Sequence, residues 1–159
     1  MINDTQFEKI KSEAEAFYHT IDEVFCPYLN ETVSFNAKGL KHTKFKKDTV
    51  ARSHSDQCMR LKHIHLAPRI IEQSRTLQEF KEARTFEERK AHGKREFVLQ
   101  DTTYYGFIAI VRESQGMKRL KIIVKKVAGG KPYFWSIIPF WKNNQGTLRI
   151  LHNGNLEHD

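Results

Sequence analysis

Hydrophobic residues recur every three or four positions near the start of the chain, which predicts an amphipathic helix over residues 4–21. A shorter and less regular helical pattern covers residues 49–66. Pro68 favours a further helical turn over 67–72, because proline is tolerated in the first turn of a helix. Residues 32–35 are a short strand candidate. The first half of the chain is therefore expected to be mainly helical.

The hydrophobic period changes in the second half, where β-branched and aromatic residues gather into runs. These runs cover 97–112, 119–127 and 133–139, and short turns at 114–116 and 129–130 connect them. Strands joined by tight turns predict an antiparallel meander. Helices followed by such a meander predict an α+β fold.

The remaining segments have weaker patterns. Residues 76–80 are a weak strand candidate, and the charged stretch 81–95, which includes Glu87 and Glu88, is expected to be a mobile, solvated loop. The last residues are expected to be loosely held. The chain is thus expected to comprise an acidic N-terminal helix (1–31), a central α+β domain (32–142) and a C-terminal tail (143–159).

The chain has 159 residues, of which 39% are hydrophobic and 11% aromatic, which excludes a wholly disordered chain and fits one domain. The first residues do not have the basic start and apolar run of a signal peptide. No apolar stretch approaches the roughly 20 residues that span a bilayer. Two cysteines cannot form a disulfide framework. We therefore expect a cytoplasmic protein, in the producing or a target cell, with no membrane partner.

The formal net charge of +8 comes from two segments. Residues 32–69 hold nine lysines and arginines against two acids, and residues 116–142 hold seven against none. Residues 1–31, by contrast, hold two lysines against seven acids. If the fold joins the two basic segments, they form a face that attracts polyanions, most often nucleic acid. The alternative is a solvated basic surface that keeps the protein soluble.

His42 lies among lysines, and like charges disfavour the cationic form of a histidine. A neutral imidazole near pH 7 can act as a general base. The alternative, which the spacing by itself favours, is a surface histidine on a basic helix.

A metal site would have to use Cys58, His63 and His65, with His54 as a fourth ligand. Histidines two positions apart point to different sides of a helix, and the spacing matches no zinc pattern. We therefore expect no metal, and we expect Cys58 to lie in the core.

Side-chain alternation places Lys125 and Lys126 on opposite faces of their predicted strand. The next strand supplies the indole of Trp135 and the hydroxyl of Ser136. A sheet face with cations, rings and a hydroxyl suits a nucleotide, because cations bind phosphate and rings stack on bases. The alternative is an ordinary two-sided core in which both lysines extend to the edge.

Two parts of the chain resemble a known family, the phage-associated barnase–EndoU–colicin–RelE-like (BECR-fold) nucleases. Residues 33–42 are similar to the opening motif of these proteins, and Lys121–Val127, with Gly130-Lys131 and Phe134–Pro139, is similar to their last strands. The resemblance covers residues 33–142. It implies N-terminal helices packed on a four- to five-stranded antiparallel sheet, and metal-independent RNA cleavage by a toxin or by a phage or mobile-element effector.

The resemblance also implies roles for individual residues. His42 would take the proton of a 2′-hydroxyl that attacks the adjacent phosphate to give a 2′,3′-cyclic phosphate. Lys125, or Lys126, would stabilise the developing charge, and Ser136 would bind a phosphate oxygen. No cofactor is expected. Substrate contacts are expected from Lys38, Lys41, Lys44, Arg60, His63, Arg112, Lys121, Lys126 and Trp135.

Two other functions fit the same sequence. One is a non-catalytic RNA-binding module of the same fold, and the other is a phage or mobile-element interaction protein that binds an acidic partner such as an antitoxin. The acidic N-terminal helix either docks on the basic face or packs through Phe7, Ile10 and Phe17 with its acids in water. We favour the second arrangement.

Overall fold

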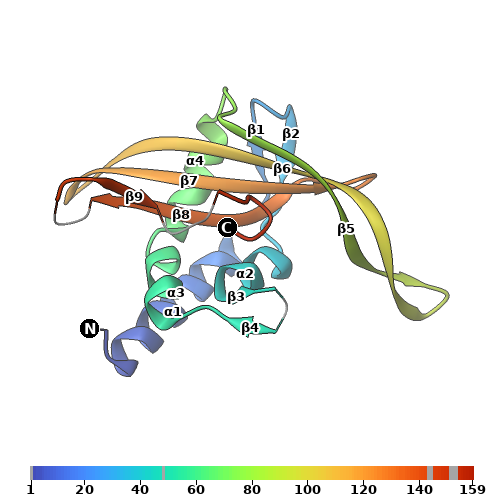
Figure 1. Ribbon diagram of the computed structural model, residues 1–159, viewed down its shortest axis with the longest axis horizontal. Helices are drawn as coiled ribbons and strands as arrows, with labels where there is room; N and C mark the ends of the chain where they lie inside the picture. The colour runs from blue at the N-terminus through green and yellow to red at the C-terminus, as the bar shows by residue number, and fades with distance from the viewer. Residues whose placement is uncertain (1, 48, 143–144, 151–153) are drawn as a thin grey trace.

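Helices and short strands lie against one long, curled antiparallel sheet in the computed structural model of the protein (Figure 1). The structure describes residues 2–47, 49–142, 145–150 and 154–159. Within these residues, no helix has the length and hydrophobicity of a membrane span. The predicted α+β class is confirmed.

The first helix, α1, covers Asp4–Thr20 and confirms the helix predicted over 4–21. It packs through Phe7 and Tyr18, both of which are buried. Phe17, which was expected on the packing face, is 40% exposed instead. The acidic helix is therefore part of the main core, held mainly by apolar contacts.

Short elements follow α1. They are the hairpin strands β1 (Val24–Cys26) and β2 (Glu31–Val33), α2 (Ala37–Lys44), the two-stranded ribbon β3 (Phe45–Lys46) and β4 (Val50–Ala51), α3 (His54–Leu61), the 3₁₀ helix η1 (Ile64–Leu66) and α4 (Ala67–Gln73). The strand candidate at 32–35 overlaps β2, which begins one residue earlier and ends at Val33. The irregular pattern over 49–66 divides into β4, α3 and η1, and the helical turn predicted at 67–72 is α4.

The second half of the chain forms the sheet. Its strands are β5 (Glu79–Ala91), β6 (Lys94–Glu113), β7 (Gly116–Val127), β8 (Tyr133–Lys142) and β9 (Leu148–Ile150), each antiparallel to the next. The predicted meander is confirmed as β6, β7 and β8. Register shifts once, between Ile123 and Val124, where a bulge lies in the β7–β8 pair.

The prediction of a mobile loop over 81–95 is wrong. These residues form most of β5, the turn and the start of β6, which together make a hairpin arm that extends beyond the helices (Figure 1). His92 and Gly93 form its two-residue turn, with φ values of 51° and 75°. Positive φ at both positions is what a type I′ hairpin turn requires. Neither face of the outer arm is covered by a core, so both faces carry charged residues, and the sequence of this strand does not show the usual alternation of apolar and polar residues.

The two faces of the sheet differ in chemistry. Alternation from the observed register places the apolar residues Phe107, Leu120, Ile122 and Ile137 on the face that joins the main core with α1 and α4. The opposite face carries Lys121, Lys125 and Ser136 beside a smaller apolar cluster. That cluster consists of Tyr104, Ile123, Ile138 and Leu156.

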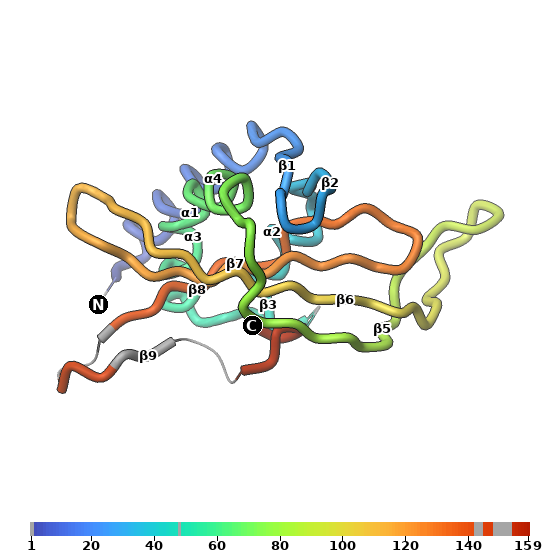
Figure 2. Tube along the Cα trace, turned by 90° about the horizontal axis from the view of Figure 1, so that it is seen from above, coloured from blue at the N-terminus to red at the C-terminus, as the bar shows by residue number. Residues whose placement is uncertain are grey.

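The C-terminal segment lies on this second face, away from α4 and the β1–β2 hairpin (Figure 2). Leu156 and Asp159 are both buried, and Lys81 Nζ donates to Asn155 Oδ1 at 2.6 Å. The expectation of a loosely held tail is therefore wrong for residues 155–159, while residues 143–144 and 151–153 lie outside the described part. These residues are held because Leu156 joins the smaller apolar cluster of this face and Asn155 accepts a hydrogen bond from Lys81.

Helix α2 approaches strand β8 closely because one of its residues is glycine. A Cβ placed on Gly39 would lie 2.1 Å from the main-chain oxygen of Phe134. Asn36 caps the helix by accepting a hydrogen bond from the Gly39 amide at 3.1 Å, and its carbonyl accepts from Tyr18 Oη at 2.7 Å. This packing brings His42, in the last turn of α2, against β8.

Candidate functional site

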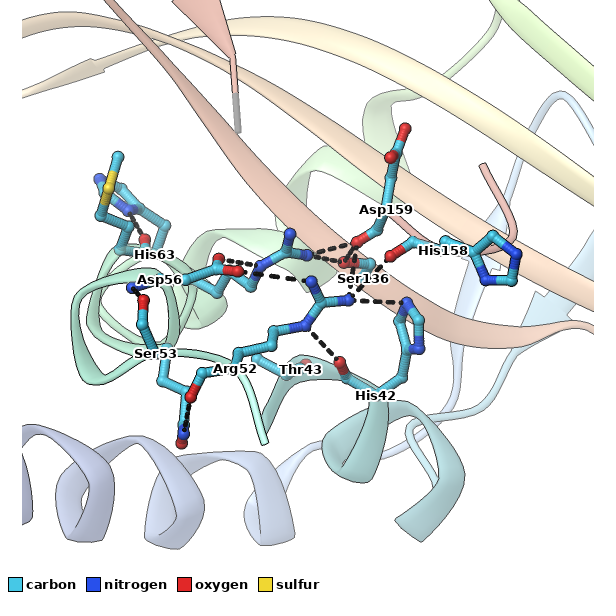
Figure 3. Close-up of polar contacts among 12 residues, drawn as sticks. His42, Thr43, Arg52, Ser53, Asp56, His63, Ser136, His158 and Asp159 are labelled. Carbon is cyan, nitrogen blue, oxygen red and sulfur yellow. Dashed lines mark hydrogen bonds and ion pairs between the residues drawn. The ribbon is translucent and has the colours of Figure 1, made fainter. Parts of the chain in front are cut away.

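Two arginines converge on strand β8 because one aspartate positions both. Ser53 caps α3, and Asp56 lies in its first turn. Asp56 Oδ1 accepts from Arg60 Nε at 2.6 Å, and Oδ2 accepts from Arg52 Nη1 at 3.4 Å. All three charged residues are buried. Figure 3 shows Arg52 between Asp56, His42 and the C-terminal residues His158 and Asp159.

The free ends of these guanidinium groups meet at one oxygen atom, the main-chain oxygen of Asp159 (Figure 3). It accepts from Ser136 Oγ at 2.8 Å, from Arg52 Nη2 at 3.3 Å and from Arg60 Nη1. Arg60 Nη1 also donates to Ser136 Oγ at 2.6 Å. We call Arg52, Arg60 and Ser136 the donor cluster. Preorganised donors of this kind stabilise an oxygen that carries negative charge.

The two arginines of the donor cluster face the negative charges of Asp56 and Asp159. Burial lowers the pKa of Arg52 to about 10, with a further contribution from the neighbouring Arg60, but this leaves it protonated at neutral pH. Both guanidinium groups donate to main-chain oxygen atoms of the tail, and they would donate to the oxygen atoms of a phosphate in the same way.

His42 lies directly beside the donor cluster. Its ring stacks on the indole of Trp135 with centroids 4.0 Å apart, and Arg52 Nη2 is 3.2 Å from its Nε2. Burial holds the pKa of His42 well below its usual range, and the charges of Arg52, Arg60 and Lys125 lower it further. The imidazole is therefore neutral at pH 7. Since arginine can only donate, Nε2 is the acceptor and the ring proton is assigned to Nδ1.

Lys125 lies near the same indole. Its ammonium group is 4.3 Å from the centroid of the Trp135 ring and 2.5 Å from Glu87 Oε1 on the hairpin arm. Glu87 is therefore not a solvated loop residue, as the sequence predicted, but a partly buried counter-ion. The hydroxyl of Tyr133 is buried without a hydrogen-bond partner among the described residues, and burial, followed by the charge of Glu87, raises its pKa.

The structure brings together many of the predicted site residues. His42, Lys125 and Ser136, which come from α2, β7 and β8, lie around Trp135 and Arg60. Lys121 is also buried on this face, where its Nζ is 2.9 Å from Glu79 Oε2 and 3.6 Å from Asp159 Oδ2. Lys38 lies at the margin, 3.9 Å from Glu87, and Lys41 is exposed on α2.

Other predicted substrate contacts lie elsewhere. Lys126 is on the opposite face of β7 from Lys125 and pairs with Glu31 at 2.6 Å, so of these two candidates only Lys125 belongs to the site. Lys44 pairs with Glu15 of α1 at 2.7 Å. His63 lies 3.3 Å from Lys118, and Arg112 is exposed near the β6–β7 turn. None of these four joins the donor cluster.

Sequence reasoning missed Arg52, Asp56 and Asp159. The first two had a usable signal, since Ser53 and Asp56 have the spacing of a helix cap and its partner, and Arg52 and Arg60 lie four residues on either side of Asp56. Asp159 had no such signal, because its contacts depend on the return of the tail to the sheet. Within the described residues, no group of three potential ligands could hold a metal, and Cys58 is buried in α3 as expected.

No family model, curated protein or solved structure matches the chain.

Proposed function

We propose that the protein is a metal-independent endoribonuclease, with RNA as its substrate. The observation that carries this proposal is the convergence of Arg52, Arg60 and Ser136 on one oxygen atom beside a neutral His42. In the proposed complex, a phosphate oxygen of the scissile phosphodiester occupies the position of the Asp159 main-chain oxygen. The donors would then bind a phosphate oxygen in place of the Asp159 main-chain oxygen, and hydrogen bonds between a guanidinium group and a charged oxygen are among the stronger ones in proteins.

The reaction follows from these positions. The 2′-hydroxyl of the preceding ribose attacks phosphorus, its proton passes to His42 Nε2, and a 2′,3′-cyclic phosphate forms. The bond from phosphorus to the 5′-oxygen breaks, and that oxygen takes a proton from water. Arg52, Arg60 and Lys125 oppose the charge that develops on the phosphorane oxygens. Arg52, which donates to Nε2 in this structure, would move its hydrogen bond to the phosphate when RNA binds.

Access to the site requires the tail to move. Residues 155–159 cover the donor cluster, and Trp135 Nε1 donates to the main-chain oxygen of Glu157 at 3.1 Å. A displaced tail would free the indole edge for a base and the three donors for a phosphate. In this proposal the tail covers the site, and RNA displaces it: a base takes the place of the tail at the indole and a phosphate takes its place at the donor cluster.

The test is cleavage of total RNA in EDTA, followed by analysis of the product ends. We expect products with 2′,3′-cyclic phosphates, and a loss of about 100-fold or more in rate for His42→Gln and for Ser136→Ala. Lys131→Ala, an exposed position that pairs with Glu23, is the control and should retain the wild-type rate. Salt-sensitive RNA binding without cleavage would contradict the enzyme and support an RNA-binding module. The absence of both would contradict RNA as the ligand.

A further inference from the structure

The outer part of the hairpin arm exposes apolar side chains that no core covers. Phe86 is 72% exposed, Phe97 is 68% exposed and Leu99 is 39% exposed. Phe86 pairs directly with Leu99, and alternation places Phe97 on the same face of the arm. The arm extends away from the helices in both views (Figures 1 and 2). Such a patch on an extended arm is typical of an interaction surface.

The outer edge of β5 is also free to pair with a further strand, as far as the described residues show. In the described part of the chain, β5 pairs with β6 alone, so one edge of this 13-residue strand keeps unpaired backbone groups. Natural proteins usually protect such an edge, because it is a template for a further strand. Every even-numbered residue from Phe80 to Lys90 is exposed, and all of them share the face of Phe86.

The charges along this face have an order that suits pairing with itself. Around Phe86 the sequence of exposed residues is Glu82, Arg84, Phe86, Glu88 and Lys90. If two copies of the strand pair antiparallel about a twofold axis at Phe86, Arg84 lies opposite Glu88 of the second copy. Glu82 then lies opposite Lys90 of the second copy. Opposite charges directly across an antiparallel pair stabilise it.

The neighbouring registers that keep the same face together do not share this match. With the axis at Thr85, Glu82 lies opposite Glu88 of the second copy, so like charges meet. With the axis at Glu87, Arg84 lies opposite Lys90 of the second copy, with the same result. Like charges directly across a strand pair are destabilising. The pattern therefore favours one register and opposes its neighbours.

We propose that the β5 edges of two copies of this chain pair antiparallel about Phe86 and join the two sheets into one continuous sheet. The two Phe86 rings then meet at the axis, beside Leu99 of each copy. Two of these charges already form ion pairs with β6 in their own chain: Arg84 lies 3.4 Å from Asp101, and Glu88 lies 3.4 Å from Arg95. In the dimer these pairs would extend across the β5–β5 contact. Mixed charge with exposed phenylalanine suits a second copy better than it suits the phosphates of RNA, which need a net positive surface.

The first test is a charge swap at Glu82 and Lys90, which take part in no described ion pair within the chain. Sedimentation velocity across a concentration series should show a dimer for the wild-type protein. Glu82→Lys and Lys90→Glu should each weaken it about tenfold in dissociation constant, because each change enters the dimer twice. The double variant E82K/K90E restores opposite charges and should dimerise like the wild type. A wild-type protein that stays monomeric, or single variants that dimerise normally, would overturn the proposal.

The second test fixes the register. Residues directly opposite in an antiparallel pair have Cα atoms about 4.5–5.5 Å apart, which is within disulfide range. Phe86→Cys should therefore form a covalent dimer under mild oxidation. The control is Phe97→Cys, at a similarly exposed position one strand further from the axis, which should form little covalent dimer. The native Cys26 and Cys58 are buried and do not interfere. Equal crosslinking of both variants would show random collision and contradict the register.

Discussion

Arg52 contacts His42 twice: its Nε donates to the main-chain oxygen of His42 at 3.0 Å, and its Nη2 lies 3.2 Å from the imidazole Nε2. The first bond fixes the arginine against helix α2. Burial is the main reason that the imidazole is neutral, and the second contact adds to it because a protonated ring would face a permanent cation. The same arginine thus fixes the position of the proposed base and adds to the effect of burial on its pKa. It also connects α2 to α3 through Asp56.

This relationship predicts a pH-dependent stability. Because the pKa of His42 is lower in the folded protein than in the unfolded chain, the unfolded chain binds more protons below its ordinary value of about 6.5. The free energy of unfolding should therefore fall as the pH falls from about 6.5, by up to about 1.4 kcal/mol per pH unit for this group. Urea denaturation between pH 5 and 7 measures the slope.

His63, whose pKa is also lowered by burial, contributes in the same direction. The control is therefore a comparison of His42→Gln with His63→Gln. We expect the larger loss of slope in His42→Gln, because its ring is more deeply buried and faces more cations. An unchanged slope in His42→Gln would contradict a neutral buried His42.

Asp56 predicts a large effect on stability. Its carboxylate is the counter-ion of both buried arginines. Asp56→Asn keeps the size of the side chain but leaves two buried guanidinium groups without that charge, and breaking a buried ion pair from one side typically costs 3–5 kcal/mol. We expect a loss of about 3 kcal/mol in the free energy of unfolding. Asp101→Asn, in an exposed ion pair with Arg84, is the matched control and should change stability by less than about 0.5 kcal/mol. Equal losses would contradict this account.

The parts of the fold that the sequence predicted are those in which local pattern and tertiary environment agree. Helix α1 buries one regular face, so its period is visible in the sequence. Strands β7 and β8 are covered on both faces of the sheet, so they are visible as runs of β-branched and aromatic residues. The hairpin arm was missed because charged side chains dominate residues 81–95 and both faces of the outer arm meet solvent. Its His92-Gly93 turn was the available signal, but one two-residue turn among so many charges is a weak one.

The residues of the site, like the elements of the fold, were predicted only in part. His42, Lys125 and Ser136 could be proposed because they fall on the motifs of a resemblance, and the structure brings them to one place. Asp159 and Glu87 could not be found, because both act through long-range contacts that place a carboxylate beside a lysine of β7. Arg52 and Arg60 each lie four residues from Asp56, a spacing that is also common in ion pairs on the surface of helices. What distinguishes these two pairs is their burial, which the sequence does not reveal.

Gly39 predicts a further effect on the scaffold of the site. Alanine has the higher helix propensity by about 1 kcal/mol, so Gly39→Ala would stabilise an isolated α2. In the protein, however, the added methyl group would meet the Phe134 carbonyl oxygen and the Tyr18 hydroxyl, which is 2.9 Å from the ideal Cβ position. Because a strand carbonyl cannot move cheaply, we expect a net loss of about 2 kcal/mol. Thermal denaturation measures it, with Ser12→Ala at an exposed position of α1 as control. A stabilised Gly39→Ala would show that α2 does not pack on β8.

Lys81 predicts how firmly the tail covers the donor cluster. Its ammonium group holds Asn155 at 2.6 Å and Glu157 at 3.0 Å, yet it lies outside the cluster itself. Lys81→Ala removes both bonds, worth together about 1 kcal/mol at a partly exposed position, and should raise the population of the open tail about fivefold. If RNA binds where the tail lies, cleavage at low RNA concentration should rise by a similar factor. Lys94→Ala, exposed on the arm, is the control and should leave the rate unchanged. A slower Lys81→Ala variant would show instead that residues 155–159 complete the site rather than cover it.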